Sequence, residues 1–228
     1  MKKLFLILLS IPMLGQGNQL SISIDSIATQ NTVNERVFTI YYHINNPTEK
    51  DVSFFLDTKK IIPSSVSSMQ YRPYYSVFQN DNQIDIEQIL SPNRVISLND
   101  SDFVKNLQMQ TIEIDSVFKN YKNKGGKSDN KYWVIKNKEL KQSIITLKAN
   151  EIKYFSYKFY WNKNRYFLQD NLEYYLNEKD IYTINLAFDL KKFAFKDQLT
   201  LEEFSLIEKD KNFIEGVFTS NKIEIDFR

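Results

Sequence analysis

RVFTIYYHINNPTEKDVSFFLD, residues 36–57, is the stretch that decides the fold class. In its first half, apolar side chains alternate with polar ones, which is the period of a strand with one buried face. The apolar positions there are Phe38, Ile40, Tyr42 and Ile44. After the turn residues NNPTEK, the second half places Val52, Phe54 and Leu56 on one face in the same way. The stretch therefore predicts two antiparallel strands joined as a hairpin.

The same alternation occurs at the start of the chain and through its second half. The alternating stretches are residues 20–27 (LSISIDSI), 145–161 (ITLKANEIKYFSYKFYW), 181–190 (IYTINLAFDL) and 217–227 (VFTSNKIEIDF). The second of these contains a turn at KANE, so it predicts two strands. About seven short strands with one apolar face each indicate an antiparallel β-sandwich.

Helical spacing replaces this pattern in the middle of the chain. Between Asp100 and Tyr121, apolar residues recur at intervals of three, four or seven positions, which predicts one long helix. Ile112 and Ile114 taken alone also fit a strand. Residues 129–142 can form a second helix.

A further helix is expected after Thr200, because Thr200 and Glu203 match a capping box. The sequence thus predicts a mainly β fold, α+β by content, in which residues 18–228 form a single sandwich domain. A helical insertion at about residues 60–142 interrupts the sandwich. An insertion of this length suggests a function, since ordinary connections span about 4 to 6 residues.

The first seventeen residues have the order of a secretory signal peptide. Lys2 and Lys3 precede the apolar run LFLILLSIPMLG, and Gly15 and Gly17 satisfy the small-residue rule for cleavage. The run is shorter than the roughly 18 residues of a membrane span. We therefore expect residues 1–17 to be removed. The mature chain, without a transmembrane segment, would be exported to the periplasm, the cell surface or the medium.

Composition excludes several classes of function. Without Lys2 and Lys3, 28 basic residues face 28 acidic ones, whereas a nucleic-acid-binding protein carries a basic excess. The chain has no cysteine and a single histidine, His43, which we expect to have a structural role. A serine or cysteine triad and a structural zinc site are therefore not expected. Few glycines and no GxSxG motif argue against nucleotide binding and a hydrolase elbow, so we expect no cofactor, metal site or catalytic residue.

The middle region also holds the best candidates for a contact surface. Eight lysines against two acidic residues lie between Lys119 and Lys141, interleaved with tyrosine and tryptophan. Such a patch can dock an anionic surface, and exposed tyrosines supply contact area. The candidate residues are Tyr71, Tyr74, Tyr75, Lys122, Lys124, Lys127, Lys131, Tyr132 and Trp133. A solvated helix surface is the alternative interpretation of the lysines.

The signal MKKLFLILLSIPMLGQG, the bias towards Asn, Lys, Ile and Tyr, and the stretch 36–57 resemble secreted proteins of Bacteroidota. The stretch is also similar to the Asn-Pro hairpins of bacterial immunoglobulin-like domains, a resemblance that covers about a fifth of the chain. It implies an immunoglobulin-like β-sandwich with an adhesive or scaffolding role.

These observations favour a non-enzymatic binding or structural protein of the cell envelope, with an envelope protein or a glycan as partner. Two alternatives stay open. A carbohydrate-binding module would show a coplanar row of exposed tyrosines, and a carboxylate-based hydrolase would show two close carboxylates in a cleft.

Overall fold

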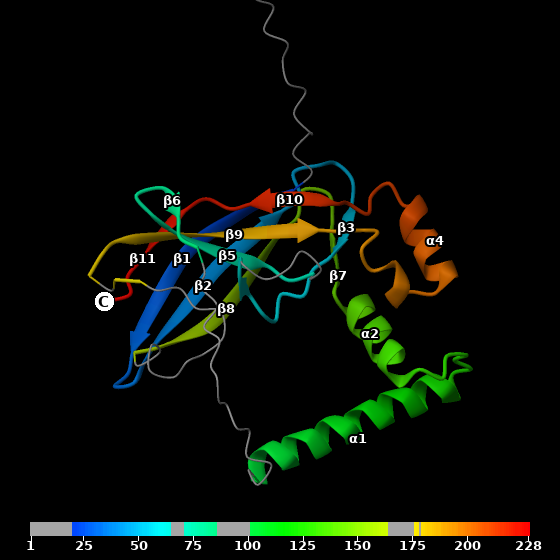
Figure 1. Cartoon of the computed structure of the whole chain (residues 1–228). Helices are drawn as coiled ribbons and strands as arrows, with labels where there is room; N and C mark the ends of the chain where they lie inside the picture. The colour runs from blue at the N-terminus through cyan, green and yellow to red at the C-terminus, as the bar shows by residue number, and fades with distance from the viewer. Residues whose placement is uncertain (1–19, 65–70, 86–100, 164–175, 178) are drawn as a thin grey trace, which may run out of the picture.

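The computed structural model describes residues 20–64, 71–85, 101–163, 176–177 and 179–228 (Figure 1). The fold is mostly β, with three α-helices in this part of the chain, as the sequence predicts. The predicted signal peptide, residues 1–17, lies outside the described residues.

Two larger sheets form the body of the protein. The first is antiparallel, in the order β1-β2-β8, and comprises β1 (Ser21–Asn31), β2 (Glu35–Asn45) and β8 (Ile152–Asn162). The second is mixed, because β4 and β5 run parallel while its other pairs are antiparallel. Its strands are β4 (Ile62–Pro63), β5 (Tyr74–Gln79), β6 (Asn82–Gln83), β9 (Tyr182–Leu190), β10 (Gly216–Thr219) and β11 (Ile223–Ile225).

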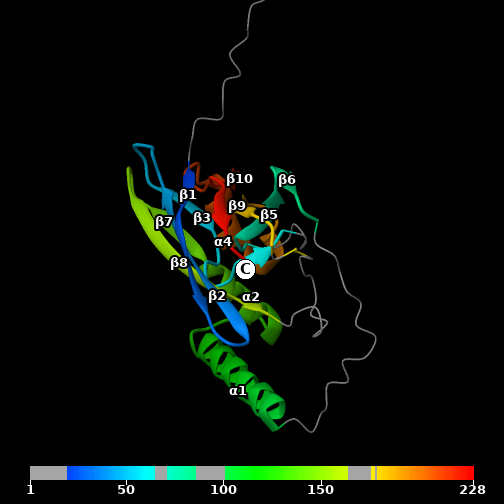
Figure 2. The same cartoon turned by 90° about the vertical axis from the view of Figure 1, so that its left-hand side faces the viewer.

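The inner faces of the two sheets share one apolar core, and Figure 2 shows the sheets as adjacent layers. Tyr42 of β2 meets Phe188 of β9 edge to face, with 6.2 Å between the ring centroids. Phe38 contacts Phe227 near the C-terminus at 5.3 Å. The alternating residues of the sequence are the ones that fill this core, so the predicted inward faces of these strands are confirmed.

The predicted hairpin of residues 36–57 is wrong in its pairing, although both of its strands exist. β2 pairs with β8 along its whole length. The strand that follows, β3 (Val52–Phe55), pairs with β7 (Ile144–Leu147) in a separate two-stranded sheet. The two connections, residues 46–51 and 148–151, lie side by side, because backbone hydrogen bonds join Asn46 N to Glu151 O and Asn150 N to Thr48 O.

The NNPTEK turn is therefore a corner at which a pair of strands passes from one sheet into the next. The fully buried Asn46 side chain fixes this corner. Its amide nitrogen donates to the carbonyl oxygens of Lys50 and Lys148, each at 2.8 Å, and its oxygen accepts from Thr48.

The helices are α1 (Ser101–Asn123), α2 (Lys131–Gln142) and α4 (Leu201–Lys209), with a short 3-10 helix, η1 (Lys196–Gln198). All three predicted helices are confirmed, and Ile112 and Ile114 lie in α1 rather than in a strand. The predicted helical insertion at 60–142 needs a correction, because its first part contains β4, β5 and β6, and β5 pairs directly with β9. Both figures show α1 and α2 at one end of the sheets, with α1 outermost.

A second apolar cluster attaches α2 and α4 to this end of the body. Its buried members are Phe55, Leu140, Phe195, Leu199, Phe204 and Phe213. Phe55 comes from the strand β3 immediately after the corner, so the corner also supports the helices.

The capping box of α4 gives a direct test of local helix stability. Thr200 Oγ1 accepts from Glu203 N at 3.2 Å, and Glu203 Oε2 accepts from Thr200 N at 2.9 Å. Thr200→Ala removes the side-chain cap and is expected to lower the free energy of unfolding by about 1 kcal/mol. Urea denaturation followed by circular dichroism measures this, with Thr200→Ser as the control that keeps the hydroxyl. A loss equal for both substitutions would contradict the role of the cap.

Candidate functional site

Helix α2 is held rigidly against the body by polar contacts in addition to its buried Val134 and Leu140. Asn130 caps its N-terminus by accepting from Trp133 N at 3.1 Å. The indole nitrogen of Trp133 donates to the carbonyl oxygen of Asp197 at 2.8 Å. The buried Asn137 amide donates to Gln198 O, at 2.9 Å. The side chains along the exposed face of α2 are therefore placed precisely relative to η1.

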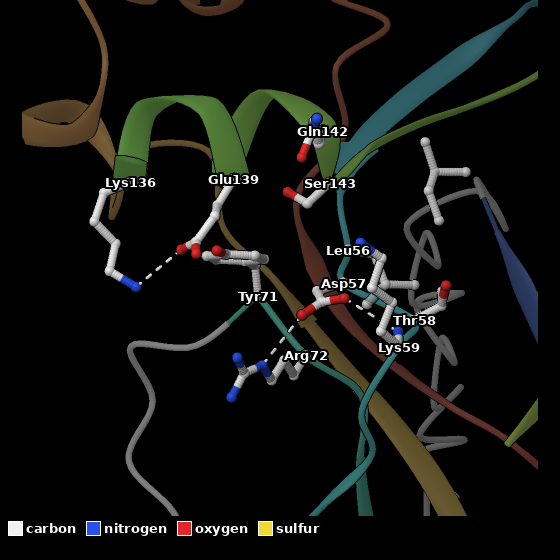
Figure 3. A pocket seen from close by; sticks show the side chains of 11 residues that line it. Leu56, Asp57, Thr58, Lys59, Tyr71, Arg72, Lys136, Glu139, Gln142 and Ser143 are labelled. Carbon is white, nitrogen blue, oxygen red and sulfur yellow. Dashed lines mark hydrogen bonds and ion pairs between the residues drawn. The ribbon is translucent and has the colours of Figure 1, made fainter. Parts of the chain in front are cut away.

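A hollow of about 320 Å³ opens where α2 meets the chain that follows β3 (Figure 3). Its walls come from residues 56–59, from Tyr71 and Arg72 ahead of β5, and from the last turns of α2. A second hollow, of about 500 Å³, shares Tyr71, Arg72 and Lys136 with the first. It is completed by Asn130, Tyr132, Trp133, Asp197 and Gln198. We call the two adjoining hollows the Tyr71 groove.

Two ion pairs line the groove. Arg72 Nε lies 3.3 Å from Asp57 Oδ2, and Lys136 Nζ lies 3.0 Å from Glu139 Oε2. The Tyr71 ring lies between these two pairs (Figure 3). Burial, and then the nearby Glu139 carboxylate, raise the pKa of the Tyr71 hydroxyl, so it is a neutral donor at ordinary pH. The hydrogen bond to Glu139 raises the pKa of Lys136 and keeps it charged.

Three of the sequence-predicted contact residues, Tyr71, Tyr132 and Trp133, converge on this groove. The other two tyrosines do not. Tyr75 stacks on Phe159 at 5.7 Å against the main core, and Tyr74 is half-buried in β5, where burial raises its pKa. Tyr71 precedes β5, whereas Tyr74 and Tyr75 lie within it and point to opposite faces of the sheet, as neighbouring strand residues do.

The four predicted lysines lie at the junction of α1 and α2 and do not line the groove. Lys122 pairs with Asp129 at 2.5 Å, and Lys131 pairs with Asp115 at 2.6 Å. Lys124 and Lys127 are exposed on the connection itself. Part of the local positive charge is therefore neutralised, by Asp129 within the lysine run and by Asp115 before it.

Sequence reasoning missed Asp57, Arg72, Glu139 and Asp197 as groove residues. Asp57 and Glu139 are 82 positions apart in the numbering, and only the pairing of β3 with β7 brings their segments together. The one local signal is that Arg72 directly follows Tyr71, an adjacent arginine and tyrosine of the kind enriched at interfaces.

The carboxylates at the edge of this region are engaged by cations. Burial by itself would raise the pKa of the Glu203 carboxyl. Its hydrogen bonds, from Lys141 and then from the Thr200 backbone, outweigh burial and hold the pKa below its ordinary value. Within the part of the chain that the structure describes, no three His, Asp or Glu side chains are grouped closely enough to hold a metal ion.

No family model, curated protein or solved structure matches this chain. Among the described residues, no helix has the length and apolar character needed to cross a membrane.

Proposed function

We propose that this protein is a non-enzymatic binding protein of the cell envelope, and that the Tyr71 groove receives a segment of a partner protein. The observation that carries the proposal is the convergence of Tyr71, Tyr132 and Trp133 with Arg72 and Lys136 on one groove. Tyrosine, tryptophan and arginine are the residues that contribute most to binding energy at protein interfaces.

The geometry of the groove also suits a polypeptide. Its base is rigid, because α2 is bonded to η1 through Trp133 and Asn137, so little ordering is required on binding. Both signs of charge are present, from Arg72 and Lys136 on one side and Asp57 and Glu139 on the other. A partner segment with mixed charges and an aromatic or aliphatic anchor complements this arrangement.

The proposal includes an immunoglobulin-like β-sandwich as the fold and export from the cytoplasm as the location. Two sheets around one core, with a strand pair that changes sheet at Asn46, support an immunoglobulin-like β-sandwich as the scaffold. The order of residues 1–17 supports export, with removal of that segment as a signal peptide.

The hydrolase alternative is less well supported by the groove. Glycoside hydrolysis needs one carboxylic acid that donates a proton and a second carboxylate near it. Asp57 and Glu139 each accept a hydrogen bond from a cation, so neither is placed to donate a proton.

The groove hypothesis predicts that Tyr132→Ala combined with Lys136→Ala weakens capture of the partner. Tyr132 is 71% exposed, so its loss removes contact area without opening the core. We expect at least a tenfold weaker interaction, which corresponds to about 1.4 kcal/mol. The measurement is a pull-down from the native cell envelope with the mature protein, followed by a binding titration with the captured partner.

Val217→Ala is the control, because Val217 is 65% exposed but lies on β10, outside the groove. The control should capture the partner as the wild type does. Equal capture by the groove variant and the wild type would show that the groove is not the contact surface.

A further inference from the structure

The outer face of the β1-β2-β8 sheet carries exposed aromatic side chains. Tyr41 is 44% exposed, Tyr154 71% and Tyr160 65%. Their neighbours in sequence, among them Tyr42 and Phe155, point inward to the core. Since strand residues alternate between faces, the three tyrosines lie on one surface of the sheet.

A β-bulge in β1 changes this face next to the tyrosines. The register of β1 against β2 shifts between Ile24 and Ser26, so that Asp25 is the additional residue. Ile24 and Ile27 both pack on the core, while Asp25 and Ser26 are both exposed. Bulges re-aim side chains and are frequent beside functional sites.

Asn221, from the connection between β10 and β11, fixes the backbone at the bulge. Its side-chain oxygen accepts from Ile24 N at 2.8 Å, and its amide nitrogen donates to Ile24 O at 3.2 Å. A residue 197 positions away thereby satisfies both backbone groups of Ile24 and holds the bulge in one geometry.

The re-aimed Asp25 meets the single histidine of the chain. Asp25 Oδ1 lies 2.7 Å from His43 Nδ1, and the His43 ring contacts the Tyr154 ring with 5.5 Å between centroids. Asp25 and His43 keep 37% and 24% of their side chains exposed. Within the described residues, the second carboxylate oxygen of Asp25 and Nε2 of His43 have no hydrogen-bond partner. The site therefore presents one acceptor, one imidazole nitrogen and one aromatic face to a ligand.

We propose that this face binds a neutral glycan, with a sugar ring against Tyr154 and its hydroxyls on Asp25 and His43. A sugar has an apolar C–H face that packs on an aromatic ring, and hydroxyls at its rim that need fixed polar partners. Tyr160 lies six residues from Tyr154 on the same strand, about 20 Å away, so the face is long enough for several sugar units.

Charge favours a neutral ligand over a polyanion. The outer face carries the negative charge of Asp25 and the positive charge of Lys158, which lies opposite Thr39 of β2. Neither positive nor negative charge is in clear excess there. Single-stranded nucleic acid, which also stacks on aromatic residues, requires a positively charged groove.

The exposed tyrosines that would serve a carbohydrate-binding role are Tyr41, Tyr154 and Tyr160 rather than Tyr71, Tyr74 and Tyr75.

Affinity electrophoresis of the mature protein in gels containing starch, xylan, mannan or mixed-linkage β-glucan tests the proposal. We expect retardation by at least one of these four polysaccharides. Tyr154→Ala and Asp25→Asn should each raise the dissociation constant obtained from the retardation at least tenfold. Leu206→Ala, at a 68% exposed position on α4 outside both candidate surfaces, is the control and should leave the retardation unchanged. Circular dichroism melting confirms that each variant is folded.

Several results would overturn the assignment. Retardation by none of the four polysaccharides would do so, and so would equal retardation of the wild type and both variants. If size-exclusion chromatography shows a dimer that Tyr154→Ala converts to a monomer, the face is a contact between two copies of this chain. The Tyr71 groove is tested by separate residues, so each hypothesis can fail while the other stands.

Discussion

A Phe227→Asp variant is expected to be largely unfolded at room temperature. Phe227 is 1% exposed and its ring lies 4.3 Å from that of Trp161, with Phe38 and Tyr182 also in contact. Removing such a ring costs roughly 3–5 kcal/mol. Burying a carboxylate among aromatic rings adds to that cost. The sum approaches the whole stability of an ordinary domain, about 5–15 kcal/mol.

Thermal melting and urea denaturation followed by far-ultraviolet circular dichroism measure this effect. Leu201→Asp is the matched control, because Leu201 is 84% exposed and opens α4, where a negative charge is favourable. The control should differ from the wild type by less than about 0.5 kcal/mol. A Phe227→Asp variant as soluble and heat-stable as the wild type would show that the C-terminal residues do not close the core.

Strands were predictable where only one face of the strand is buried. In β9 the buried residues alternate, since one face lies on the core, and the sequence shows the same period. β5 was missed because Ser76 and Val77, which are neighbours, are both buried. A strand covered on both faces has no period of two, so the pattern that identifies strands disappears there.

The pairing of strands could not be obtained from local pattern. An Asn-Pro turn between two alternating stretches fits a hairpin and a sheet-switching corner equally well. The choice depends on Glu151 and Lys148, whose carbonyl oxygens accept hydrogen bonds from the backbone and side chain of Asn46. These residues are about a hundred positions away, and no spacing rule connects them to the turn.

The residues of the candidate sites also fall into those that local sequence could identify and those that it could not. Tyr132 and Trp133 were identifiable, since both aromatic residues lie within the lysine cluster that the sequence shows. The Asp25–His43 pair was not, because the strand period places Asp25 on the outer face but does not reveal the bulge. That bulge depends on Asn221, almost two hundred residues later. Contacts of this kind follow from the folded arrangement alone.

An Asn46→Asp variant is expected to lose about 3 kcal/mol of stability, although the change only replaces the amide NH2 group by an oxygen. The Asn46 amide nitrogen donates to Lys50 O and Lys148 O in a buried environment. A carboxylate oxygen at this position would face both carbonyl oxygens and donate to neither. The corner would lose the side-chain hydrogen bond to Lys148 O that joins its two connections and the one to Lys50 O, while the backbone hydrogen bonds between the connections remain.

The pH dependence of the same variant distinguishes this cause from a general loss of packing. Burial and the facing carbonyl oxygens raise the pKa of the introduced carboxyl above its unfolded value. The unfolded state therefore holds fewer protons than the folded one, and the deficit relative to the wild type should shrink as the pH falls through that pKa. Asn34→Asp, at an exposed turn, is the control and should show a small, nearly constant difference. A deficit for Asn46→Asp that does not change with pH would mean that the amide donors do not hold the corner.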